Sequence, residues 1–110
     1  MYRFSTNPIN IFTTFNPAQA RQLWLTFKQE ESGTEITRTK EDLLAALEQV
    51  YRTEDGLFCF STAFSQEESG TFMQDFPILV QLRWSERDGH SDATNIYSFY
   101  MEDVLKEGVI

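Results

Sequence analysis

The spacing of apolar residues changes at Gly56, and this change does most to limit the folds open to the chain. Between Thr39 and Gly56 apolar residues recur every three or four positions, as they do in an amphipathic helix. After Gly56 the pattern has a period of two over 57–64, 77–86 and 94–101. Because a period of two is that of a β-strand, we expect three consecutive strands that form an antiparallel meander. The last two should form a hairpin with a long polar loop.

The segment between Thr39 and Gly56 has the clearest helical pattern in the chain. Thr39 is a suitable N-cap, and Glu41 and Asp42 fall in the first turn, where the helix dipole favours acidic side chains. Gly56 is placed to end the helix. The apolar stripe along one side consists of Leu43, Leu44, Leu47, Val50 and Tyr51. We therefore expect a helix between these two end residues.

The segment 16–33 fits two descriptions. Asn16 is a suitable N-cap and Pro17 a suitable first helical residue, and Gly33 can end a helix. The residues with helical spacing are Ala20, Leu23, Trp24 and Phe27. The alternative is a strand over 23–27, where apolar side chains also alternate. The specific start signal favours the helix.

Two shorter segments complete the predicted fold. The stretches 9–15 and 34–39 carry the alternating or β-branched residues that are typical of strands. The predicted order is β-α-β-α-β-β-β, in a single α+β domain over residues 1–110. The antiparallel sheet would have four to five strands, with two helices packed on one face. Its opposite face would meet solvent or a partner.

The charge of the chain restricts the partners that it can bind. It has 17 acidic and 9 basic residues, which give a net charge of −8. This charge repels nucleic-acid phosphates and anionic membranes, so neither is expected as a direct partner, whereas a basic protein surface is favoured. One cysteine, Cys59, excludes an internal disulfide, and the sequence shows neither a signal peptide nor a membrane span. We expect a cytoplasmic protein.

The hexapeptide QEESGT occurs twice, at 29–34 and 66–71. Similarity does not continue usefully on either side, so a duplicated structural unit is not indicated. We expect an acidic turn used twice, since Gly33 and Gly70 can adopt a positive φ at low cost. The functional interpretation is one acidic patch, which requires both copies to lie at the same edge of the fold. Its residues would be Glu30, Glu31, Glu67 and Glu68.

No arrangement of residues points to catalysis. His90 is the only histidine, and no nucleophile elbow, phosphate-binding glycine loop or dinucleotide fingerprint occurs. The loop 86–92 has acidic residues beside His90 that can in principle bind a divalent cation, but their spacing matches no standard metal loop. We therefore expect no enzymatic activity, no cofactor and no metal.

Aromatic residues supply the remaining candidate contacts. Both faces of the segment 94–101 are apolar or aromatic, so this strand is either covered on both sides or open to a partner. The predicted aromatic anchors are Trp84, Tyr97 and Tyr100.

These features favour a small acidic protein-binding module. We expect an inhibitor, immunity or anti-defence type protein that occludes a basic partner surface, such as the nucleic-acid cleft of a nuclease, by acidic mimicry. One alternative is a homodimeric accessory or assembly factor without an inhibitory role. A second alternative is a small-ligand or metal-binding protein that uses the 86–92 loop.

Overall fold

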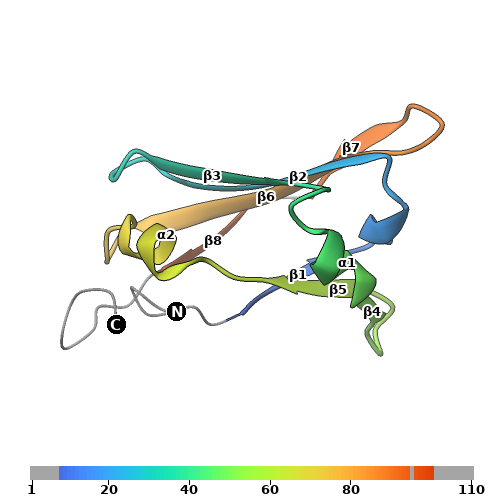
Figure 1. Ribbon diagram of the computed structural model, residues 1–110, viewed down its shortest axis with the longest axis horizontal. Helices are drawn as coiled ribbons and strands as arrows, with labels where there is room; N and C mark the ends of the chain where they lie inside the picture. The colour runs from blue at the N-terminus through green and yellow to red at the C-terminus, as the bar shows by residue number, and fades with distance from the viewer. Residues whose placement is uncertain (1–7, 95, 101–110) are drawn as a thin grey trace.

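Two antiparallel sheets lie in facing layers (Figure 1). The computed structural model describes residues 8–94 and 96–100. The smaller sheet has the order β1-β5-β4 and consists of β1 (Ile9–Thr13), β5 (Phe58–Thr62) and β4 (Tyr51–Arg52). The larger sheet has the order β3-β2-β6-β7, and β8 also pairs with β6. Its strands are β2 (Gln22–Gln29), β3 (Thr34–Thr39), β6 (Pro77–Ser85), β7 (Ser91–Ala93) and β8 (Tyr97–Tyr100).

The helices of the described residues are short and lie on the same side of the large sheet as the small sheet (Figure 1). They are the 3-10 helix η1 (Pro17–Gln19), α1 (Leu44–Glu48) and α2 (Gln66–Gly70). The α+β class is therefore confirmed for one compact domain, although its strands form two sheets rather than one. None of the helices in the described part of the chain combines the length and the apolar character that crossing a membrane requires.

The predicted helix over 16–33 is wrong. Its start signal is real, because the side chain of Asn16 accepts a hydrogen bond from the main chain of Ala18 and Pro17 opens η1, but the helix ends after one turn. The chain then becomes β2, the strand that was the alternative. It pairs with β3 on one side and β6 on the other. A strand buries every second residue from Leu23 to Gln29 against the core, which a helix of the same sequence would not do.

The predicted helix between Thr39 and Gly56 is much shorter than expected. Only Leu44–Glu48 is α-helical, and Tyr51–Arg52 forms β4, which pairs with β5. Gly56 has a φ of +86° and closes the turn between these two strands instead of ending a helix. Tertiary pairing with β5 therefore overrides the local helical pattern in the second half of the segment.

The strand predicted over 34–39 is confirmed, and that over 9–15 is confirmed as Ile9–Thr13. Of the three later segments, the described residues form strands over Phe58–Thr62, Pro77–Ser85 and Tyr97–Tyr100. The hairpin of the last two is also confirmed, since β6 and β8 pair antiparallel with Ile78 opposite Phe99. The continuous meander is wrong, because α2 separates β5 from β6 and carries the chain from the small sheet to the large one.

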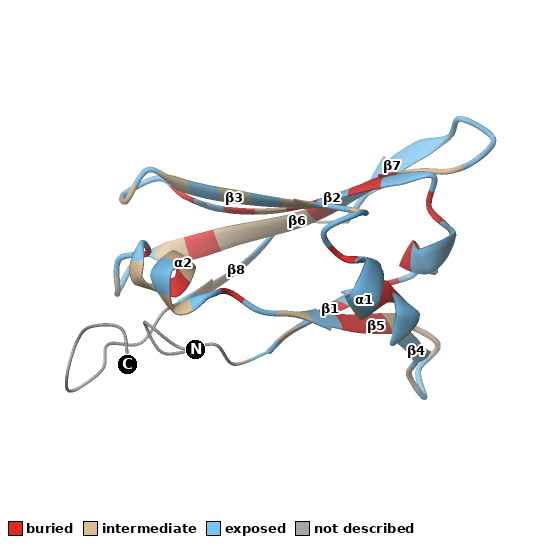
Figure 2. Ribbon diagram, in the orientation of Figure 1, coloured by how far each residue is buried: buried red, intermediate tan, exposed pale blue. Residues whose placement is uncertain are grey.

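The core lies between the two sheets. Buried positions recur along β2 and β6 in one layer and along β5 in the other (Figure 2). Its largest fully buried side chains include Phe27, Phe60, Phe64 and Phe72. Edge-to-face packing joins Phe27 to Phe64, with ring centroids 4.7 Å apart. Such packing fixes α2 and its flanking loops against the end of the large sheet.

Candidate protein-binding site

The two QEESGT copies have different structures. In the first copy Gln29 ends β2, residues 30–33 form a tight turn, and Thr34 begins β3. Gly33 has a φ of +70° in that turn, as expected for glycine. In the second copy the first five residues form α2, so the prediction of a turn is wrong there.

The residue before each copy accounts for the difference. Ser65 is the N-cap of α2, and its side chain accepts a hydrogen bond of 3.1 Å from the main chain of Glu68. The carboxylate of Glu68 in turn accepts a hydrogen bond of 2.9 Å from the main chain of Ser65, which completes a capping box. Lys28 stands at the corresponding position before the first copy and lies within β2. The Ser-x-x-Glu pattern is visible in the sequence and is the signal for this helix.

The two copies nevertheless meet at one end of the molecule. The hydroxyl of Thr34 donates a hydrogen bond of 3.1 Å to the main-chain oxygen of Thr71, and these threonines are the last residues of their copies. The β2–β3 turn and α2 accordingly lie side by side at the left of Figure 1. The condition for a shared acidic patch, that both copies lie at the same edge, is therefore met.

Gln29 fixes the loop that follows α2 to this end. The side chain of Gln29 is fully buried, and its nitrogen donates hydrogen bonds of 2.9 Å to the oxygen of Met73 and 3.0 Å to that of Phe76. Its side-chain oxygen accepts a hydrogen bond of 2.7 Å from the main-chain nitrogen of Met73. The first residue of the first copy thus positions the residues that follow the second copy.

Three of the four predicted glutamates are exposed at this end. Glu30 and Glu31 lie on the β2–β3 turn, and Glu67 lies on α2. Asp75, in the loop after α2, is also exposed and has a φ of +64°, a conformation that aspartate tolerates better than most residues. This fourth carboxylate was not predicted from the sequence.

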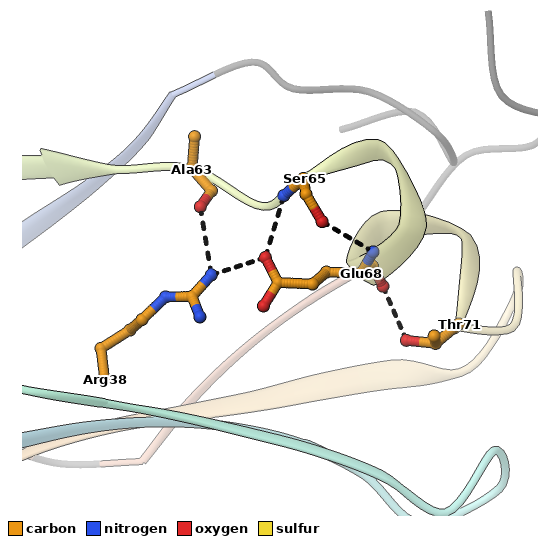
Figure 3. A network of polar contacts seen from close by, with 5 residues as sticks. All are labelled: Arg38, Ala63, Ser65, Glu68 and Thr71. Atoms are coloured by element: carbon orange, nitrogen blue, oxygen red, sulfur yellow. Dashed lines mark hydrogen bonds and ion pairs between the residues drawn. The ribbon is translucent and has the colours of Figure 1, made fainter. Parts of the chain in front are cut away.

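Glu68 has a different role. Its Oε1 lies 2.6 Å from Nη2 of Arg38 on β3, and the same oxygen accepts the capping bond from Ser65 (Figure 3). The hydrogen bond from Arg38 lowers the pKa of Glu68 below its ordinary value and raises that of Arg38. Glu68 therefore ties α2 to β3, and its charge is largely compensated within the protein.

Two apolar side chains are also exposed at this end of the molecule. Met73 is 42% exposed and Phe76 is 39% exposed, on either side of Asp75 in the loop that Gln29 holds. No sequence pattern marks them, because their exposure depends on how the loop is fixed. We call the set Glu30, Glu31, Glu67, Met73, Asp75 and Phe76 the acidic end.

The three predicted aromatic anchors lie in different environments: one in the core and two on opposite faces of β8. Trp84 is only 6% exposed and stacks on Phe15, with ring centroids 5.5 Å apart, so it belongs to the core. Tyr97 and Tyr100 are each 56% exposed on β8. Tyr100 pairs with Pro77, the residue after Phe76, and therefore borders the acidic end. The register places Tyr97 on the opposite face of β8, beside Val80.

The 86–92 loop lies at the far end of β6 from the acidic end (Figure 1). It is closed by hydrogen bonds from the main chain of Glu86 to His90 and of Gly89 to Glu86, and the main chain of His90 donates to the carboxylate of Asp88. Within residues 8–94 and 96–100, no three His, Cys, Asp or Glu side chains form a group that could hold a metal ion.

The site is therefore one end of the molecule, where exposed carboxylates from two identical peptides occur together with exposed apolar side chains of the loop after α2. Its geometry suits contact with a protein, since it presents both charge and apolar area. Comparison with protein-family models, with curated proteins and with solved structures finds no match to this chain.

Proposed function

We propose that this protein uses its acidic end to bind a protein with a basic surface, and that it blocks that surface by occupying it. The observation that carries the proposal is the hydrogen bond between Thr34 and Thr71, which brings the exposed glutamates of both QEESGT copies to one end. A net charge of −8 supports the same choice of partner. Complementary charge accelerates association and disfavours wrong partners.

The exposed apolar side chains of the acidic end supply the second part of binding. Charges at the rim of an interface contribute mainly to the rate of association, whereas buried apolar anchors contribute most of the affinity. Met73 and Phe76 have the exposure and the fixed loop that such anchors require. Tyr100 extends the apolar area along β8. A partner would therefore need an apolar pocket within its basic surface.

Within this proposal, the protein is an inhibitor or immunity-type protein that acts in the cytoplasm. The acidic end would take the place of nucleic-acid phosphates in the basic cleft of a nuclease or a similar effector. Binding alone would suffice for inhibition, because the partner's ligand and the acidic end cannot occupy the same cleft.

The experiment compares two triple charge reversals that change the net charge equally. The first is Glu30→Lys, Glu31→Lys and Glu67→Lys at the acidic end. The control is Glu41→Lys, Glu48→Lys and Glu54→Lys, which changes exposed glutamates in and around α1. Both leave the ion pair between Glu68 and Arg38 intact.

Partners are captured with the wild type and both variants and identified by mass spectrometry, and affinity is then measured against salt concentration. We expect a basic protein that the wild type and the control bind and the acidic-end variant does not, with a loss of at least about tenfold in affinity. Equal losses in the two variants would show that only overall charge matters. Unchanged binding in the acidic-end variant would exclude this surface.

A further inference from the structure

A cavity of about 480 Å³ opens between the two sheets, on the side where β1 and β8 are edge strands. Its floor is formed by Leu25 and Leu82, which are 0% and 1% exposed. Ile11 and Phe99 contribute from the two facing layers. The volume falls within the range of about 300–1,000 Å³ that is usual for small-molecule sites. The acidic-end residues do not line it, so a ligand in this cavity would be independent of the proposed function.

The chemistry of the lining restricts the ligand. No described residue of the lining carries a charge. Two of its polar residues bond to each other: the side chain of Gln81 donates a hydrogen bond of 3.1 Å to the main-chain oxygen of Thr94. The hydroxyl of Thr94 accepts a further bond of 3.1 Å from the main chain of Leu82. A charged ligand would therefore lose its hydration without gaining a counter-ion, which is costly, whereas an uncharged apolar ligand would gain by leaving water.

The entrance adds aromatic area and the exposed polar side chains of Asn10, Tyr97 and Ser98. Phe12 is 47% exposed and Tyr97 is 56% exposed, and both line the cavity. An exposed tyrosine offers an aromatic ring to the body of a ligand and a hydroxyl to its polar end. A ligand seated here would thus place its apolar part on Leu25 and Leu82 and its polar part near Tyr97.

We propose that this cavity binds an uncharged, mainly aliphatic small molecule with a single hydroxyl or carbonyl end. The lining supplies apolar contact along its length, and none of its described residues is a charged side chain that could pair with a carboxylate, a phosphate or an amine. Tyr97, assigned by the sequence to a protein interface, is in this proposal a ligand contact.

Two probes of equal chain length test the charge requirement. Decan-1-ol and decanoate are titrated into the full chain at pH 7, where the carboxylate is ionised, and binding is followed by calorimetry and by the methyl NMR signals of Ile11, Leu25, Val80 and Leu82. We expect the alcohol to bind at least about tenfold more tightly, because the anion has no counter-ion in the cavity. Equal or tighter binding of decanoate would overturn the proposal.

Two neighbouring substitutions on β6 test the location. Val80 lines the cavity, whereas Leu79 lies on the opposite face of the sheet. We expect Val80→Phe to fill the cavity and weaken decan-1-ol binding at least about tenfold, and Leu79→Phe to leave it within about threefold. Leu57→Phe, which fills the cavity from the segment before β5, provides a second variant if Val80→Phe does not fold as judged by circular dichroism.

Three results would contradict the assignment. The first is equal loss of binding in Leu79→Phe and the cavity-filling variants. The second is the absence of any methyl shift in the wild type with decan-1-ol. The third is a doubled mass in light scattering, with concentration-dependent shifts of the same methyl signals, which would show that a second copy covers the cavity.

Discussion

The hydroxyl of Thr34 and the main-chain oxygen of Thr71 are joined by a hydrogen bond of 3.1 Å, although these residues are 37 positions apart in the chain. Each ends one copy of the same hexapeptide, and one copy is a hairpin turn while the other is a helix. The same six residues therefore adopt two different conformations, and the two copies lie side by side at one end of the molecule. Matched positions in the two copies provide natural controls for each other.

Gln29 and Gln66, the first residues of the two copies, should differ in their contribution to stability. Gln29 is fully buried and makes three hydrogen bonds to the loop after α2, whereas Gln66 begins α2 and is partly exposed. We expect Gln29→Ala to lower the free energy of unfolding by about 2–4 kcal/mol, and Gln66→Ala by less than about 0.5 kcal/mol. Urea denaturation measures both, and similar losses would contradict the role of Gln29.

Ser32 and Ser69 should respond to alanine with opposite signs. The hydroxyl of Ser32 contacts the hydroxyl of Thr34 at 3.0 Å and accepts from its main-chain nitrogen at 3.3 Å. The hydroxyl of Ser69 is buried and has no hydrogen-bond partner within the described residues. We expect Ser32→Ala to lower the free energy of unfolding by about 0.5–1 kcal/mol and Ser69→Ala to raise it by about 1 kcal/mol. Thermal denaturation measures both variants, and a change in stability in the same direction for both would refute this prediction.

The ion pair between Glu68 and Arg38 should make stability depend on pH in the acidic range. Because the hydrogen bond from Arg38 lowers the pKa of Glu68 in the folded state, the unfolded chain binds the proton more readily. The stabilisation is therefore complete above the ordinary glutamate pKa of about 4.3 and is lost as the pH falls through the lowered value.

Glu68→Gln tests this effect while keeping the helix cap, since glutamine also serves in a capping box. We expect the variant to be less stable than the wild type by about 1–2 kcal/mol at pH 7 and to approach it at low pH. Glu67→Gln, on the exposed side of α2, is the control and should follow the wild-type curve. The free energy of unfolding is measured against pH for each protein. A constant difference between the wild type and Glu68→Gln from pH 7 to pH 2 would contradict the coupling between the protonation of Glu68 and stability.

The two tryptophans should report different environments. Trp84 is 6% exposed and stacks on Phe15, whereas Trp24 is 37% exposed on the outer face of the large sheet. In Trp24→Phe only the buried Trp84 remains, and we expect its fluorescence emission to be blue-shifted and weakly quenched by acrylamide. In Trp84→Phe only the exposed Trp24 remains, and we expect its emission to be red-shifted and strongly quenched. Equal quenching in the two variants would show that Trp84 is accessible.

Segments with strict alternation or specific caps were predictable from the sequence. The strands around Ile78 and Phe99 and their pairing follow from a period of two. The one-turn helix at Pro17 follows from Asn16, and the capping box of Ser65 and Glu68 is legible in the sequence, although a turn was expected there. These features depend on neighbours in sequence, so local physical chemistry is sufficient to specify them.

Local sequence patterns are sufficient for the α+β class and the strongest strands, and the acidic charge and the two identical acidic peptides are present in the sequence itself. The strand at 22–29 depends on long-range contacts, because pairing on both sides and burial of every second residue outweigh its helical start signal. Long-range contacts also bring the two peptides together, pair Glu68 with Arg38 and bury Trp84. These outcomes depend on contacts between residues far apart in the chain. The free energies of such contacts cannot be read from local sequence patterns.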